Sequence, residues 1–177
     1  MKRTTLIILS IFIITQYGHA QNKARSFLGL GLGLDYGGIG TRFEFVPVKP
    51  LGLFGGLGYN LINVGYNAGA NFKLVAGKRG TPIISAMYGY NGAIKIKNVV
   101  TGKTEGHTYN GVTAGIGFEV FNKKLRNKLV CQALIPFRSS RFRKDYDNYK
   151  KQGAIFQGNV PDVTFSIGYH FGPSGSK

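Results

Sequence analysis

The chain has 177 residues, a length that suits one domain, and its 23 Lys and Arg against 7 Asp and Glu give a formal net charge of +16. The single cysteine, Cys131, excludes an internal disulfide and with it the class of small disulfide-stapled secreted domains. Abundant glycine (27 residues) together with 13 Phe and 10 Tyr, in short alternating segments, favours an all-β protein.

The N-terminal segment has the pattern of an export signal. A basic start is followed by the apolar run Leu6–Ile14 and then by the small-x-small motif Gly18-His19-Ala20. Residues 1–20 are therefore predicted to be a cleaved signal peptide, which leaves 21–177 as one exported domain. The apolar run is too short to span a bilayer as a helix of the mature protein.

The next segment, residues 28–36, alternates large apolar side chains with glycine. It reads Leu-Gly-Leu-Gly-Leu-Gly-Leu-Asp-Tyr, so the leucines and Tyr36 share one face, while the glycines and Asp35 share the other. This two-residue period predicts a strand of a narrow barrel, with lipid outside and a crowded lumen inside.

Seven further segments continue the alternation. We expect strands at 27–36, 38–46, 51–60, 66–75, 83–91, 109–120, 128–137 and 162–171. Each is near the ~9–11 residues that a tilted membrane strand needs. The longest connections, 92–108 and 138–161, are then extracellular loops, and the compact turns and both chain ends lie on the periplasmic side. The predicted fold is an all-β, eight-stranded antiparallel up-and-down transmembrane β-barrel.

Tyr and Phe residues near the strand ends are expected to form two girdles at the membrane–water boundaries. The outer girdle would contain Tyr36, Tyr59, Tyr66, Tyr90 and Tyr109, and the inner one Phe45, Phe72, Phe118, Phe121 and Phe171.

The glycine-rich first strand and the alternating last strand, Val163–Phe171, give the chain a resemblance to the small OmpA/OmpX-type outer-membrane β-barrels of Gram-negative bacteria, over about residues 26–171. The resemblance implies a monomer in the cell outer membrane, with duties in envelope integrity, adhesion or stress. It also implies that the barrel-assembly machinery reads the last strand, with Phe171 as its final aromatic residue.

Five ionisable side chains fall on predicted inward faces: Arg42, Glu44, Lys73, Glu119 and His170. Charges inside a narrow barrel are costly unless they are paired. We therefore predict a polar network that joins Arg42 and Lys73 to Glu44 and Glu119 and closes the lumen to water. A gated, porin-like pore is the alternative.

The loop 138–161 is predicted to contain a short amphipathic helix on the barrel rim. Phe142, Tyr146 and Tyr149 recur with helical spacing, Ser139 or Ser140 could cap the start, and Gly153 could end it. The loop is basic, with Arg138, Arg141, Arg143, Lys144, Lys150 and Lys151. These cations suit contact with anionic lipid groups such as lipopolysaccharide phosphates. A solvated loop whose aromatic residues rest on the rim is the alternative.

The expected function is therefore that of an integral outer-membrane protein with a structural or interaction role, partnered by outer-membrane lipids. No cofactor, metal or nucleic acid is expected, since basic groups such as Lys128 are dispersed among turns and His and Cys lack metal-ligand spacing. An enzyme is not expected. Two alternatives stay open: a secreted or periplasmic lipocalin-like ligand-binding barrel, and a lipid-modifying outer-membrane enzyme that uses His107 with Ser139 or Ser140.

Overall fold

The computed structural model describes residues 24–75, 78–97, 104–123, 126–151, 155–156 and 161–173. The predicted signal peptide and Gly153, the expected end of the rim helix, lie outside these ranges. Among the described helices, none is both long and apolar enough to cross a membrane.

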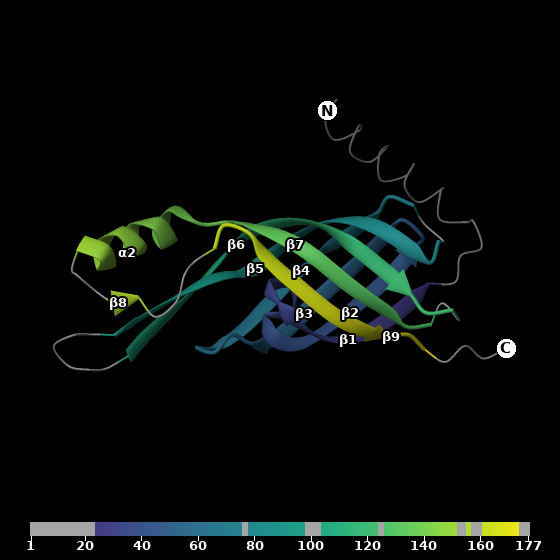
Figure 1. Cartoon of the computed structure of the whole chain (residues 1–177), viewed down its shortest axis with the longest axis horizontal. Coiled ribbons are helices and arrows are strands. Elements are labelled where there is room, and N and C mark those ends of the chain that lie inside the picture. Colours follow the sequence, from purple (N-terminus) through teal and green to yellow (C-terminus); the bar gives the residue numbers. More distant parts are fainter. Residues whose placement is uncertain are drawn as a thin grey trace, which may run out of the picture.

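The described chain forms a closed barrel of antiparallel strands (Figure 1). The strands of the barrel are β1 (Arg25–Gly33), β2 (Gly38–Val48), β3 (Leu51–Tyr59), β4 (Val64–Lys73), β5 (Gly80–Lys97), β6 (Thr104–Phe121), β7 (Lys128–Phe137) and β9 (Thr164–Phe171). Sequence neighbours pair throughout, β9 pairs with β1, and the β4–β5 ladder joins the two halves. The predicted eight-stranded antiparallel up-and-down barrel is confirmed. A two-residue strand, β8 (Ile155–Phe156), adds to β5 outside the barrel.

The two faces of the barrel wall have opposite chemistry. Large apolar side chains point outward: Phe43 is 52% exposed, Ile116 66% and Phe165 79%. Buried side chains on the inner face include charged and amide groups, as in Arg42 and Asn71, both 0% exposed. Successive strand residues face opposite sides, so this arrangement follows directly from the alternating sequence. The predicted outward and inward faces of the barrel strands are confirmed.

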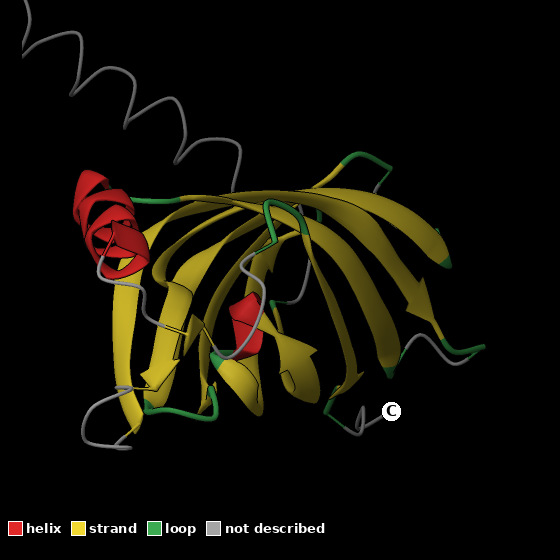
Figure 2. Ribbon diagram, turned by 60° about the vertical axis from the view of Figure 1, so that its left-hand side comes forward, coloured by secondary structure: helices red, strands yellow, loops and turns green. Residues whose placement is uncertain are grey.

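The first strand is shorter than predicted because the chain turns into the lumen at its end. After Gly33, residues Leu34–Tyr36 form one turn of 3-10 helix, η2, and all three side chains are buried. Figure 2 shows this turn within the ring of strands. The prediction that Leu34 and Tyr36 face outward is therefore wrong. Gly33 and Gly37 flank the turn at φ values of 140° and 71°, a region that glycine adopts without a Cβ clash.

Strands β5 and β6 are longer than predicted, so much of the expected loop 92–108 is a hairpin. The hairpin continues past the barrel wall, and its ladder shifts register between Tyr90 and Gly92. Its inner side chains Ile94 and Ile96 form an apolar cluster with Tyr109 and with Phe142 of α2 (Ser140–Lys151). This separate core supports the extension of the ladder. The helix predicted for the next loop is confirmed.

Two more residues placed in the girdles are buried instead. Tyr109 is 7% exposed because α2 covers it, and Phe121 is 9% exposed because it packs inside the barrel against Phe27. Both residues share the inward face of β6 with Thr113 and Glu119, so the two-residue period itself places them inward, and nearness to a strand end does not place a ring in a girdle. The hairpin and α2 lie at one end of the barrel, and the compact turns lie at the other (Figure 1).

Candidate functional site

The barrel lumen contains paired charges of both signs. Among the described residues, the buried ionisable side chains comprise three carboxylates, three cations and one histidine: Asp35, Glu44, Glu119, Arg42, Lys73, Lys128 and His170. An unpaired charge in so narrow a barrel would be strongly destabilising. The equal numbers of carboxylates and cations allow complete pairing.

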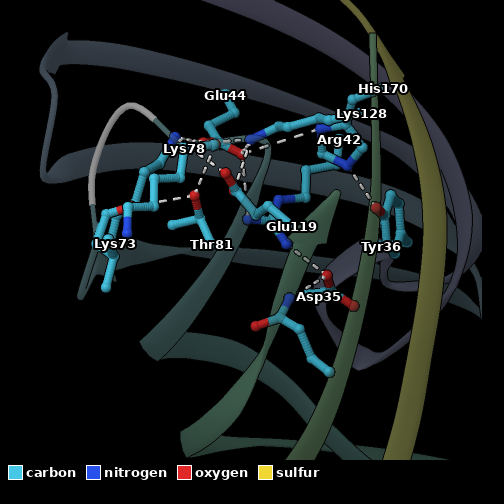
Figure 3. A network of polar contacts seen from close by, with 12 residues as sticks. Asp35, Tyr36, Arg42, Glu44, Lys73, Lys78, Thr81, Glu119, Lys128 and His170 are labelled. Carbon is cyan, nitrogen blue, oxygen red and sulfur yellow. Dashed lines mark hydrogen bonds and ion pairs between the residues drawn. The ribbon is translucent and has the colours of Figure 1, made fainter. Parts of the chain in front are cut away.

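Four of these side chains form a ring of alternating charge (Figure 3). Lys128 Nζ lies 2.8 Å from Glu44 Oε1 and 2.6 Å from Glu119 Oε1. Lys73 Nζ lies 3.1 Å from Glu119 Oε2 and 3.6 Å from Glu44 Oε1. The four residues come from β7, β2, β6 and β4, so the ring ties opposite sides of the barrel together.

Arg42 extends the network along the lumen. Its guanidinium lies 3.5 Å from Glu44 and 2.5 Å from Asp35 Oδ2. The same group lies over the ring of Phe54, 3.7 Å from the ring centroid, an arrangement in which the aromatic face attracts the cation. Arg42 therefore links the charge ring to the inserted turn η2.

The inserted turn is held by its polar side chains. Asp35 accepts hydrogen bonds from Gln132 Nε2 at 3.1 Å and from Ser166 Oγ. The hydroxyl of Tyr36 shares a 2.5 Å hydrogen bond with Nε2 of His170, whose Nδ1 lies 3.9 Å from Glu44 Oε2. The η2 turn is thus bonded to β7 and to β9.

Glycines on the inner face make room for this turn. A Cβ atom at Gly168 would lie 2.0 Å from the Tyr36 hydroxyl oxygen, and one at Gly56 would lie 2.0 Å from the Asp35 carbonyl. A Cβ at Gly31 would lie 2.6 Å from the Tyr36 ring. Because these inner-face glycines have no side chains, they leave the space that the η2 turn occupies.

Apolar side chains pack on both sides of the charged layer. At the turn end of the barrel, Phe27 and Phe121 pack with Val46, and the Lys128 ammonium lies 4.6 Å from the Phe27 centroid. Farther along the lumen lies a second apolar cluster, which contains Leu34, Phe54, Met87 and Leu134. Within the described barrel, the charged layer thus lies between two clusters of apolar side chains.

The structure brings the five predicted lumen residues, Arg42, Glu44, Lys73, Glu119 and His170, into one network. The predicted network lacks five further members, Asp35, Tyr36, Lys128, Gln132 and Ser166. Lys128 was counted with the basic turn, although its alternation with Val130 and Gln132 along β7 places all three on the inner face. That alternation was the available signal. The alternation of residues 28–36 likewise places Asp35 on the inward face with the glycines, although its partners depend on how η2 folds.

The outer end of the barrel has a second candidate site. A cavity of about 380 Å³ lies between α2 and the end of β7. It is lined by Pro136, Phe137, Arg138, Phe142, Arg143, Tyr146 and Asp162. Of the six loop cations predicted to meet anionic lipid, Arg138 and Arg143 line this cavity. The others, Arg141, Lys144, Lys150 and Lys151, are exposed elsewhere on α2.

The helix above this cavity is fixed by its contacts. The Ser139 hydroxyl accepts a hydrogen bond from the Phe142 amide and so caps the start of α2. Asp145 accepts a 2.9 Å hydrogen bond from the Tyr109 hydroxyl, and burial together with this bond raises the pKa of Tyr109 above its usual range. His107 stacks on Tyr149 with ring centroids 6.1 Å apart. Ser139 and His107 thus each have a structural contact of their own.

The last residue of β9, Phe171, faces outward at 50% exposure and contacts the Tyr169 ring edge to face, with centroids 5.0 Å apart. It lies opposite Leu28 of β1 in the ladder that closes the barrel. An assembly role for this residue stays a prediction.

No protein-family model matches this chain, and no curated protein matches it in sequence. Among solved structures, the chain is similar to the N-terminal β-barrel domain of Pseudomonas aeruginosa OprF, with a TM-score of 0.54 and 10% sequence identity. The similarity covers 85% of this chain and 98% of that one. At this identity the similarity shows the fold alone, a small closed β-barrel.

Proposed function

We propose that this protein is an integral outer-membrane β-barrel with a closed lumen. It acts as a structural or interaction component of the envelope through the β5–β6 hairpin and α2. The observation that carries the proposal is the inverted distribution of side chains, with large apolar groups outside the barrel wall and paired charges inside it. Lipid satisfies such an exterior, whereas water does not.

The same distribution argues against a lipocalin-like ligand-binding barrel. A soluble barrel of that kind needs an apolar interior for its ligand and a polar exterior for water. Here the interior space is taken by η2 and by the charge network of Glu44, Lys128 and their neighbours. The same proposal has four further parts. They are export through a cleaved signal peptide, assembly with Phe171 as the terminal signal, a monomeric state and contact with lipopolysaccharide.

Cell fractionation followed by gel electrophoresis of unheated and heated samples tests the membrane assignment. A closed barrel leaves no unpaired strand edge, so it should resist detergent at room temperature and migrate faster before heating than after. Recovery of the protein in the soluble fraction, with one band under both conditions, would contradict the proposal.

Planar-bilayer recordings test the closed lumen. The unmodified protein should give no steady conductance, because the charge ring and η2 fill the lumen. Replacing Glu44 or Glu119 by Ala should leave Lys128 and Lys73 to share a single carboxylate and produce intermittent current. A large, steady channel in the unmodified protein would show that the lumen is an open pore.

A further inference from the structure

The cavity between α2 and β7 lies where two kinds of surface meet. Phe137, on its barrel side, is 58% exposed and continues the apolar outer face, and its ladder partner Val112 is 51% exposed. On the other side the cavity is lined by Arg138 and Arg143. A ligand that fits both walls must have an apolar part and an anionic part.

Arg138 is fixed in place within this cavity. Its side chain is 11% exposed; Nη1 lies 3.1 Å from Asp162, and Nη2 donates to the Pro161 carbonyl. The guanidinium carbon lies 5.2 Å from the centroid of the Phe142 ring. The buried Nε has no hydrogen-bond partner among the described residues. Arg138 is therefore a preorganised cation whose Nε–H donor is unused.

Arg143 adds a second cation whose charge is not neutralised locally. It is exposed on the first turns of α2, and no carboxylate of the described chain lies within 4.0 Å of it. The nearby Asp145 carboxylate is already paired with Tyr109 and, at 3.9 Å, with Arg141. The remaining acid of the cavity, Asp162, is 98% exposed, so water and salt weaken its field. The cavity therefore has a net positive charge.

We propose that this cavity binds a phosphate group of an outer-leaflet glycolipid, with the guanidinium groups of Arg138 and Arg143 on the phosphate and the acyl chains along Phe137. The assignment rests on the proposed membrane location. Guanidinium groups suit phosphate because their planar fork donates two parallel hydrogen bonds. The cavity volume of about 380 Å³ is in the range of small-molecule sites, which leaves room for a phosphorylated sugar.

Native mass spectrometry of the full-length protein in detergent, titrated with diphosphorylated lipid A, tests this assignment. The double variant Arg138→Gln/Arg143→Gln should weaken lipid A binding by about tenfold or more, since it removes both charge-assisted contacts. The matched control Arg141→Gln/Lys144→Gln removes the same charge from exposed positions outside the cavity and should change binding by less than about threefold. Arg143→Gln alone should already weaken lipid A binding. Because the Arg143 side chain is exposed, this substitution should leave the fold intact, so misfolding would not explain the loss.

Three results would overturn the assignment. Equal loss in the two double variants would mean that diffuse charge attracts the lipid. If dephosphorylated lipid A bound as tightly as diphosphorylated lipid A, the cavity would not recognise the phosphate. If free inorganic phosphate bound as tightly as lipid A, the lipid part would make no contribution to binding. Any of these three results with normal heat-modifiable migration would overturn the cavity assignment alone, whereas loss of heat-modifiable migration would overturn the membrane proposal and the assignment that rests on it.

Discussion

Lys128 is the side chain on which the lumen network depends most. Its ammonium lies within 3 Å of both Glu44 and Glu119, at 2.8 and 2.6 Å, and it is fully buried. The neighbouring cation Lys73 contacts the same carboxylates at longer distances. Removing one member of a buried ion-pair network leaves uncompensated charge, a larger effect than the net contribution of the intact network.

Lys128→Met should therefore destabilise the barrel by about 3–5 kcal/mol, because Glu119 would keep only Lys73, and Glu44 would keep only Lys73 and Arg42 at 3.5–3.6 Å. The free energy of unfolding in urea, measured on lipid- or detergent-embedded protein, checks the value. Lys123→Met, at an exposed position of the neighbouring turn, is the control and should change it by less than about 0.5 kcal/mol. Similar effects of the two substitutions would contradict the ring as described.

The turn η2 is the element that distinguishes this barrel interior from a simple tube. Its insertion needs inner-face positions without side chains, and Gly168 supplies one directly against the Tyr36 hydroxyl. Gly55 lies on the outward face of β3, where a Cβ would meet only the Asn67 carbonyl oxygen at 4.0 Å. The two glycines therefore have different reasons to be in the sequence.

Gly168→Ala should destabilise the protein by about 1–3 kcal/mol through overpacking against Tyr36. Gly55→Ala makes the same chemical change on the outer face and should be neutral or slightly stabilising, since glycine weakens a strand. Thermal midpoints of the gel-shift transition compare the two variants. Equal midpoints would mean that η2 does not occupy the lumen.

The outer hairpin and α2 form an element with its own apolar core. Phe142 packs in it against Ile94, Ile96 and Tyr109. Phe142→Ala should cost about 3–5 kcal/mol of local stability and release the hairpin, while the closed barrel stays folded. Limited proteolysis should then cut within 92–108, with the barrel's heat-modifiable migration unchanged. The control Asn148→Ala, on the exposed face of α2, should leave the cleavage rate unchanged. If Phe142→Ala also abolished the heat-modifiable migration of the barrel, the hairpin and α2 would not be an independent element.

For the whole molecule, the surrounding medium decides what an exposed apolar side chain costs or contributes. Ile116 is 66% exposed and lies between Ile84 and Ala133 on neighbouring strands, midway along the barrel part of β6. In water, a charge there would be accommodated easily. In a bilayer, the same charge would lie near the middle of the hydrocarbon.

Ile116→Arg should accordingly destabilise the folded protein in lipid vesicles by about 2–4 kcal/mol. Asn148→Arg introduces the same side chain on the exposed face of α2, outside the barrel wall, and should change stability by less than about 0.5 kcal/mol. Unfolding titrations in vesicles measure both. If Ile116→Arg were as mild as Asn148→Arg, the outer face would not be in contact with lipid.

Much of the barrel could be predicted because strand alternation is a local property. Leu30, Phe43 and Ile116 face outward as their two-residue period indicates, and the inward position of Arg42, Glu44 and Glu119 follows from the same period. Strand ends were harder to place. Leu34 and Tyr36 continue the outward alternation in sequence, but the strand ends at Gly33 and the η2 turn carries both side chains into the lumen.

The sequence by itself determined the closed antiparallel barrel, the number of its strands and the chemistry of its two faces, because backbone pleating sends neighbouring side chains to opposite sides. The tertiary structure alone decided how the lumen is filled and where the outer cavity lies. Lys128 meets Glu44 across 84 positions of sequence, and Ser166 meets Asp35 across 131. Such pairs depend on the register in which the strands close and on the path of η2, which no local pattern contains.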